Sequence, residues 1–236
     1  MFEASRRASV LQLRAAGMYC LSTTFDGGYR RADAIYAATV PSGWNRTDLA
    51  AYAAERRQSA GFEESGPTLL TGVDLEHARL ASADEVVVCA TAGISNPAAL
   101  PMEESAATTR RTDERPPPGT VNLVVGTTRA LTDGGLATLL GVAVEAKAAT
   151  LLAETGFPGT TSDAVIVACQ PDGKPATFAG SATPVGDAAR ACVRDAVRAS
   201  LASRYPNGAY PASVAAAEYG VITDRVTTVN PIPHDK

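Results

Sequence analysis

The chain has 236 residues, 45% of them hydrophobic, which is enough apolar material for one large domain with a sizeable core. Its formal net charge is −4, and its basic residues form only short pairs, so a nucleic-acid-binding protein with a basic face is disfavoured. The first ten residues lack the apolar run of a secretory signal, and the longest apolar stretch, 136–152, is interrupted by Glu145 and Lys147. We therefore expect a single cytoplasmic domain over residues 1–236, with no membrane span and no nucleic-acid partner.

Predicted strands and one helix fill the first 90 residues. The apolar, β-prone runs at 10–13, 18–23 and 35–40 are separated by a turn at 26–28, which predicts paired antiparallel strands. Thr47 is a good N-cap and predicts a helix over 48–59 that ends before Gly61. Two further strands are predicted at 68–73 and 85–90, the second buried on both faces because its apolar run is continuous.

Two long helices dominate the second half. After a segment at 101–118 that is rich in Glu, Arg, Thr and Pro, and is predicted to be a mobile surface excursion, a strand follows at 120–127. Thr132 and Asp133 begin a helix that runs to 155 and is stopped by Gly156, while Thr183 and Pro184 begin a second helix that runs to 203. The remaining predicted elements are short: strands at 164–169, near 177–178 and near 225–229, and a helix near 212–219.

Strands and helices are mixed without strict βαβ alternation. The predicted fold class is therefore α+β, with long helices packed on mostly antiparallel sheets.

Cysteine and histidine are too sparse for a conventional metal site. Four cysteines are widely spaced without a C-x-x-C pair, and Cys89 and Cys169 lie in valine-rich runs typical of buried strands. The two histidines, His77 and His234, are far apart in the sequence, whereas zinc sites usually draw on clustered Cys and His. We expect neither a metal nor a cofactor.

Three small polar loops, at 91–96, 119–122 and 159–163, border predicted apolar strands. Strand ends of this kind can converge on one cleft. Their hydroxyl, amide and carboxylate groups are those an amide-cleaving enzyme uses as nucleophile, proton carrier and oxyanion donor.

Thr120 is the candidate nucleophile, because it follows Gly119 at the end of a proline-rich segment and opens a buried strand. If the Gly119–Thr120 bond were cut, the free α-amino group of Thr120, with an ordinary pKa of about 8, would act as the base for its own hydroxyl. The alternative is that Thr120 is simply the first β-branched residue of a strand.

Asn96 and Asp163 are the candidate partners of Thr120. Asn96 would donate a hydrogen bond to an oxyanion, or else serve as a turn residue before Pro97. Asp163 lies between a polar loop and an apolar strand, a position suited to proton transfer. Its alternative role is to accept hydrogen bonds from loop amides such as those of Thr160 and Thr161.

Glu145 and Lys147 lie two residues apart on the predicted helix, so they do not face each other. Lys147 is three and four residues from Val144 and Leu151, so it follows the apolar stripe and is better placed to reach a cleft. The alternative is a solvated helix face.

Several common active-site patterns are absent. No P-loop, no G-x-G-x-x-G after a strand and no G-x-S-x-G is present, and His77 alone does not support a serine triad.

Four segments together carry a family resemblance: T-A-G-I-S-N at 91–96, G-T-V-N at 119–122, E-A-K at 145–147 and G-T-T-S-D at 159–163. In this order they resemble the motif series of the adenosylcobinamide amidohydrolase (CbiZ) family, over about residues 10–204. The resemblance implies hydrolysis of adenosylcobinamide to adenosylcobyric acid and aminopropanol, in corrinoid salvage. The chain departs from the family's G-T-G-T-D at 159–163 and from its G-T-G-H at 180–183, so no catalytic histidine is carried over there.

A weaker resemblance concerns mechanism. Residues 119–169 are similar to the nucleophile half of the DmpA and ornithine acetyltransferase superfamily, in which a Gly–Ser or Gly–Thr bond is self-cleaved, and they imply a layered core of that kind. This resemblance implies that Thr120 is the nucleophile, that Thr161 and Asp163 polarise it, and that Asn96 contributes to the oxyanion site. The remaining polar residues of the motifs are expected to bind substrate: Ser95, Asn122, Lys147 and Thr160.

Two other functions stay open: an amidase or aminopeptidase on a small peptide-like substrate, and a corrinoid-binding protein without catalysis. The second is disfavoured because the D-x-H-x-x-G motif is absent. A homo-oligomer is also an open expectation. Four aromatic residues are candidates for stacking on a corrin, with core or rim roles as the alternative: Tyr29, Tyr36, Trp44 and Tyr210.

Overall fold

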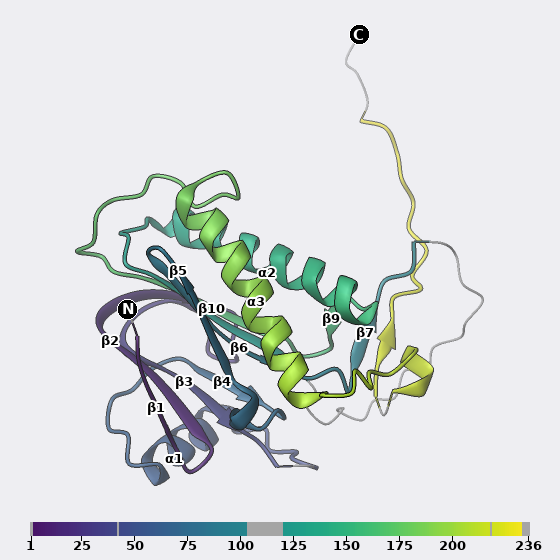
Figure 1. The fold of residues 1–236 in the computed structure, drawn as a ribbon, viewed down its shortest axis with the longest axis horizontal. Helices are drawn as coiled ribbons and strands as arrows, with labels where there is room; N and C mark the ends of the chain where they lie inside the picture. The colour runs from purple at the N-terminus through teal and green to yellow at the C-terminus, as the bar shows by residue number, and fades with distance from the viewer. Residues whose placement is uncertain (1, 42, 103–119, 218, 233–236) are drawn as a thin grey trace.

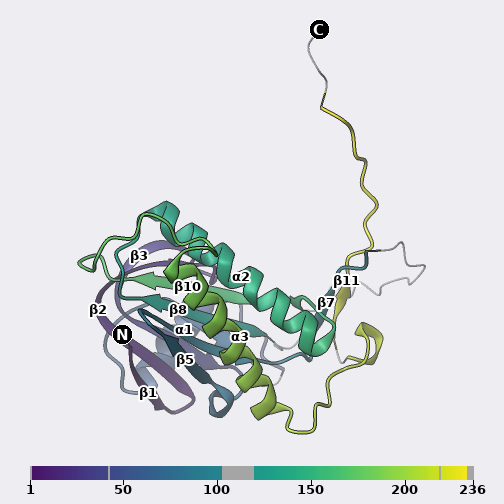
Figure 2. The same cartoon turned by 45° about the horizontal axis from the view of Figure 1, so that its top comes forward.

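The computed structural model describes residues 2–41, 43–102, 120–217 and 219–232. Two long helices, α2 (Asp133–Thr155) and α3 (Pro184–Arg204), pack together across one face of a large mixed sheet (Figure 1). Both helices remain on the same side of the sheet when the molecule is turned (Figure 2). The other face of the sheet is therefore free to pack against a different part of the chain.

The large sheet has the strand order β4-β3-β2-β10-β8-β6-β5, and β1 pairs with β2 outside this path. Its strands are β1 (Glu3–Arg7), β2 (Val10–Ser22), β3 (Gly28–Thr39), β4 (Thr68–Thr71), β5 (Arg79–Ala83), β6 (Val86–Ala92), β8 (Val121–Thr127) and β10 (Ala164–Cys169). Neighbouring strands are antiparallel except in the β3–β4 and β8–β10 pairs. The predicted α+β class, with long helices on a mostly antiparallel sheet, is confirmed.

A small three-stranded sheet lies beside the large one, with the order β11-β7-β9. Its strands are β7 (Pro97–Ala99), β9 (Gly159–Thr160) and β11 (Val221–Ile222). The remaining described helices are α1 (Leu49–Ser59) and the 3₁₀ turns η1 (Leu75–His77) and η2 (Val214–Ala216). Because β7 and β9 follow β6 and α2, this sheet ties together two of the predicted polar loops.

Strand β2 bends in its middle. Its pairing with β3 is irregular between Arg14 and Met18, and Gly17 lies there with φ +65° and donates its N–H to Asp33 Oδ1 at 2.7 Å. The half before the bend pairs with β1, and the half after it pairs with β10. A bulge bends a strand and increases its twist, so β2 connects two layers of sheet.

Three apolar clusters fill the spaces between layers. The first packs α2 and α3 against β6, β8 and β10; the second lies between these strands and β2, β3 and β4; the third lies between β3 and the segment after α1. Members of these clusters include Leu136, Leu139, Val193 and Leu201 in the first, Leu13, Met18, Ile35, Val124 and Ile166 in the second, and Tyr36 and Phe62 in the third. Every residue of β8 is buried, as its central place between layers requires.

Helix α2 begins and ends as predicted. The Thr132 hydroxyl accepts a hydrogen bond from the Gly135 N–H, and Gly156 ends the helix in the left-handed conformation. By length and composition alone α2 is apolar enough to cross a bilayer, but it packs on α3, β2 and β10. Packing of this kind is that of a core helix, so the helix gives only weak support for a membrane span.

Some predicted elements are wrong in detail. The predicted strands at 10–13 and 18–23 are one bent strand, because β3 pairs with the residues on both sides of the bulge. Helix α1 has Asp48, without a side-chain cap, in place of Thr47. Strands β1 and β5 were not predicted, because edge strands carry alternating or charged residues rather than an apolar run.

No strand is observed at 177–178 or 225–229, and the predicted helix near 212–219 is only the 3₁₀ turn η2. These runs have β-branched or helix-forming residues but no described neighbour that pairs with them, so local propensity does not suffice. From residue 103 on, the predicted excursion at 101–118 lies outside the described residues. The single domain over 1–236 stays a prediction.

Candidate active site

The three polar loops meet at one edge of the sheet. Strands β8 and β10 are parallel, so residues 120 and 163, which precede them, lie at the same end. Strand β6 is antiparallel to β8 and pairs Ala92 with Val121, which brings its carboxyl end and the loop at 93–96 to the same edge. The convergence expected from the sequence therefore follows from strand direction.

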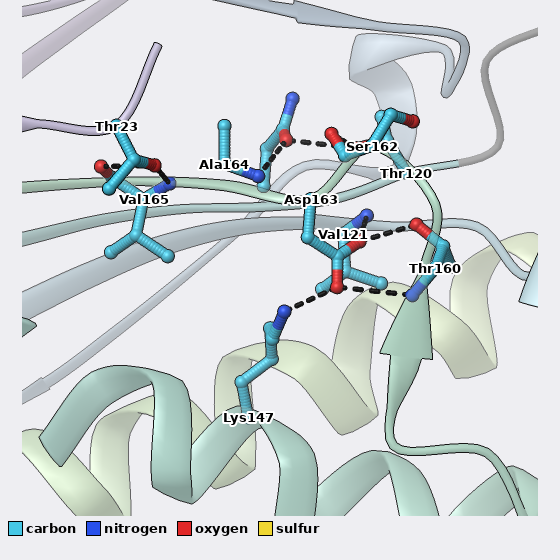
Figure 3. Close-up of polar contacts among 10 residues, drawn as sticks. Thr23, Thr120, Val121, Lys147, Thr160, Ser162, Asp163, Ala164 and Val165 are labelled. Atoms are coloured by element: carbon cyan, nitrogen blue, oxygen red, sulfur yellow. Dashed lines mark hydrogen bonds and ion pairs between the residues drawn. The ribbon is translucent and has the colours of Figure 1, made fainter. Parts of the chain in front are cut away.

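Asp163 is the centre of the polar cluster (Figure 3). Its carboxylate accepts hydrogen bonds from the Val121 N–H at 2.8 Å, from the Thr160 N–H at 3.2 Å and from the Thr160 hydroxyl. It also forms an ion pair with Lys147, which points up from α2; the two side chains are only 11% and 8% exposed. Four donors around a buried carboxylate are the pattern that holds the ionised group in place.

Asp163 contacts one of the two loop amides, those of Thr160 and Thr161, that its alternative role involves. Asp163 does bind the loop amide of Thr160, but the Thr161 amide donates instead to the carbonyl of Asn96 at 3.2 Å. The contact with Val121 places Asp163 one residue from Thr120. The arrangement suits Asp163 to positioning the start of β8.

The Thr120 hydroxyl is fully buried but surrounded by polar atoms. Its Oγ1 lies 3.0 Å from Asn122 Oδ1 and 2.9 Å from the Ser162 carbonyl, and it can donate to either. Asn122 Oδ1 also accepts from the Ala164 N–H at 3.1 Å, and its amide donates to the Leu70 carbonyl at 2.9 Å. The cluster is thus polar, not packed in hydrocarbon.

Asn96 and Thr161 form a separate pair beside this cluster. Asn96 Nδ2 donates to Thr161 Oγ1 at 2.6 Å, and strand β7 pairs Pro97 with Thr160 of β9. Asn96 is fully buried, and its Oδ1 has no hydrogen-bond partner among the described residues. The hydrogen bond of Thr161 therefore points to Asn96, not to Thr120 as the weaker resemblance implied.

Ser95 and the pair at 145–147 complete the predicted set. Ser95 is half-buried, and its carbonyl accepts from the Tyr219 N–H at 3.2 Å, so it faces the C-terminal segment. Lys147 turns inward to Asp163, while Glu145 turns outward to Arg190. The two residues of this motif therefore lie on different faces of α2, as their spacing predicted.

Several contributors were not found from sequence. The Val121 N–H and the carbonyls of Ser162 and Leu70 are backbone groups, which no residue-type pattern reveals. Gly159 also has a role: a Cβ there would lie 2.8 Å from Asp163 Oδ2 and 3.7 Å from Lys147 Nζ. Glycine leaves the room that the ion pair needs.

A hollow of about 290 Å³ adjoins the cluster, and Ser162, Asp163 and Ala164 form one side of it. Its other lining residues are Thr23, Thr24, Phe25, Val40, Trp44, Asn45, Arg46, Leu49, Thr68 and Leu70. No group of three or more Cys, His, Asp or Glu side chains fit to hold a metal occurs in the described part of the chain. A substrate in the hollow would meet Asp163 of the polar cluster together with polar and apolar side chains from the other lining segments.

The fold is α+β, and hydroxyl, amide and carboxylate side chains meet at one sheet edge, the kinds of group that amide-cleaving enzymes use. The profile of the family described as adenosylcobinamide amidohydrolase (CbiZ) matches residues 2–209. An adenosylcobinamide amidohydrolase of Halobacterium salinarum is 55% identical over 226 residues, covering 95% of this chain and 96% of the relative. The chain belongs to the adenosylcobinamide amidohydrolase family, and the predicted family and enzyme class are confirmed.

The chain is also similar, at lower identity, to a second amidohydrolase and to one solved structure. An adenosylcobinamide amidohydrolase of Methanosarcina mazei is 29% identical over 195 residues, covering 78% of this chain and 90% of the relative. Among solved structures, the PH0078 protein of Pyrococcus horikoshii OT3 has a TM-score of 0.44 and 11% identity, covering 84% of this chain and 78% of that one. The weaker resemblance to the DmpA and ornithine acetyltransferase superfamily stays a prediction.

Proposed function

We propose that this chain hydrolyses the aminopropanol amide of adenosylcobinamide and releases adenosylcobyric acid, as a step of corrinoid salvage. The observation that supports this most is the joining of all four family motifs in one place. Motif residues Thr120, Asn122, Lys147 and Asp163 share one polar cluster, and Asn96 lies beside it. The proposed reaction, hydrolysis of an amide bond, is the one that the description of the family names.

In the proposed mechanism, Thr120 Oγ1 attacks the amide carbonyl and aminopropanol leaves with a proton. Water then hydrolyses the resulting ester and restores the hydroxyl, so that one water is consumed for one amide cleaved. Cleavage before Thr120 would supply an α-amino group as base, although Gly119 lies outside the described residues. Asn96 Nδ2 would exchange its bond to Thr161 for one to the oxyanion.

Asp163 acts in this mechanism as a positioning residue. It accepts a hydrogen bond from the Val121 N–H. This contact fixes the backbone next to Thr120 and thereby the orientation of the Thr120 hydroxyl toward the substrate. Lys147 neutralises the carboxylate and Thr160 fixes its orientation. Ser95, which is half-buried, would bind a substrate amide, while Asn122 inside the cluster holds the Thr120 hydroxyl.

Product analysis on adenosylcobinamide tests the proposal. We expect wild-type protein to release adenosylcobyric acid and aminopropanol, Thr120→Ala to lose activity by orders of magnitude, and Asp163→Asn to lose less. Thr138→Ala, which removes an exposed hydroxyl on α2, is the matched control and should retain full activity. Full activity of Thr120→Ala would rule out Thr120 as the nucleophile.

Intact-mass measurement tests the cleavage step separately. Two fragments that divide the chain before Thr120 would support a free α-amino group as base. A single 24.3 kDa species with full activity would exclude it.

A small-amide amidase is the second candidate, and the size of the hollow favours testing it. A hollow of about 290 Å³ lies at the lower end of ligand pockets, which span roughly 300–1,000 Å³. Simple N-(2-hydroxypropyl) amides should therefore be assayed beside adenosylcobinamide.

Cytoplasmic location and a homo-oligomeric state remain proposals, to be tested by fractionation and by light scattering.

A further inference from the structure

The hollow beside Asp163 is lined by both polar and apolar side chains. Its apolar lining comes from four separate parts of the chain: the β2–β3 turn, the end of β3 with the segment after it, the start of α1, and β4. The side chains concerned are Phe25, Val40, Trp44, Leu49 and Leu70. An apolar wall that faces a set of polar groups is the usual composition of a small-molecule site.

Trp44 is the most distinctive residue of this wall and the single tryptophan of the chain. Its ring packs on Tyr52 of α1 with centroids 5.1 Å apart, and the Arg46 guanidinium lies 5.0 Å from the centre of the Tyr52 ring. Arg46 in turn pairs with Asp48 and Glu55. These contacts anchor the Trp44 segment to α1, so the wall is preformed.

The indole N–H of Trp44 has no acceptor within the described residues, although the nitrogen is buried. Buried indole N–H groups usually find a partner, because an unpaired donor away from water is unfavourable. Phe25, on the opposite segment, is 37% exposed and so also presents apolar surface to the hollow. The Trp44 nitrogen is closed off from the hollow and donates nothing to a ligand there. The Trp44 ring and Phe25 together indicate a ligand with a flat apolar part.

We infer that the Trp44 ring and Phe25 form the apolar wall on which the corrin ring edge of the substrate packs. The inference rests on the proposed function and names the residues that select a corrinoid over a simple amide. The hollow takes the scissile arm and the adjoining ring edge, because its volume is too small for a whole corrinoid. Asp163, which also lines the hollow, then lies near the amide to be cut.

Steady-state kinetics with two substrates tests this inference. Trp44→Ala and Phe25→Ala should each raise KM for adenosylcobinamide by about 10-fold, and Trp44→Phe, which keeps a smaller aromatic ring in the wall, by less. The same variants should raise KM for an N-(2-hydroxypropyl) amide that lacks the ring by much less than about 10-fold. Phe178→Ala is the matched control, because Phe178 is 73% exposed and does not line the hollow.

Equilibrium dialysis of cobyric acid, followed by its visible absorbance, provides a readout that needs no turnover. If Trp44→Ala and Phe25→Ala bind cobyric acid more weakly than wild type and Phe178→Ala, the inference is supported. If wild type then fails to hydrolyse adenosylcobinamide, only the proposed function is overturned. Hydrolysis by wild type with KM and binding unchanged within about twofold in both variants overturns the inference and leaves the proposed function standing. Thermal unfolding of each variant confirms that it is folded.

Discussion

Lys147 and Asp163 form an ion pair whose two side chains are 8% and 11% exposed, whereas Glu145, two residues earlier, pairs with Arg190 where the side chains are 60% and 37% exposed. The two pairs start from the same turn of α2 but differ in solvent access. Breaking a buried pair leaves a charge without a partner, while an exposed pair contributes little. The E-A-K motif at 145–147 therefore carries one buried and one exposed ion pair, whose contributions to stability can be compared.

We predict that Asp163→Asn lowers the free energy of unfolding by about 3–5 kcal/mol, because it leaves the Lys147 ammonium buried without a counter-charge. Glu145→Gln should lower it by less than about 1 kcal/mol. Urea unfolding measures both values. The double variant Lys147→Met/Asp163→Asn should recover part of the loss, and equal effects of Asp163→Asn and Glu145→Gln would contradict the assignment of a buried pair.

At the scale of elements, α2 carries Lys147 to the site, so the position of its first turn matters. The helix begins at a Thr132 cap, whose hydroxyl accepts from the Gly135 N–H at 3.1 Å. Further along the chain, Thr183 caps α3 in the same way through Gly186. Both long helices of the fold are thus fixed by a threonine side chain.

Replacing the cap of α2 tests this point. Thr132→Ala should destabilise the protein by about 1 kcal/mol, because one N–H of the first turn loses its partner. Thr132→Ser retains the hydroxyl and should retain most of the stability. Thermal unfolding midpoints compare them, and identical midpoints for wild type and Thr132→Ala would show that the cap contributes nothing.

At the scale of the whole molecule, the bend of β2 creates a second core between two layers of sheet, and this core holds Cys20 and Cys89. Burial raises the pKa of both thiols from 9.0 to about 12, with a smaller contribution to Cys20 from Cys169. The folded protein therefore keeps protons that the unfolded chain loses above about pH 9. A raised pKa of this kind contributes stability below pH 9, and that stability is lost as the pH rises toward 12.

We predict that the urea midpoint of unfolding falls between pH 9 and pH 11, beyond the fall seen in a Cys20→Ala/Cys89→Ala variant, which lacks both buried thiols. Each midpoint is compared with that of the same protein at pH 8. The variant starts from a lower stability because it has lost packing volume, so the slope with pH and not the absolute value is the test. Parallel slopes would show that these thiols do not govern alkaline stability.

The sequence by itself predicted the two long helices and the class of reaction. The helices at 132–155 and 183–203, the strand at 164–169 and the three polar loops all follow from caps, apolar runs and residue types within a few positions of each other. The family motifs contain Thr120, Asn96, Lys147 and Asp163, which lie at one edge of the folded sheet. Local signals of this kind are strong because each depends only on neighbouring residues.

Tertiary structure alone decided how these pieces meet. The bend at Gly17, the parallel pairing of β8 with β10 and the contacts of Thr161 with Asn96 and of Asp163 with Val121 all join segments distant in the chain. Runs such as 225–229 have strand propensity but no described partner to pair with. A strand, a cluster or a hollow exists only where a second segment supplies the other half of each contact, and residue type does not encode which segment that is.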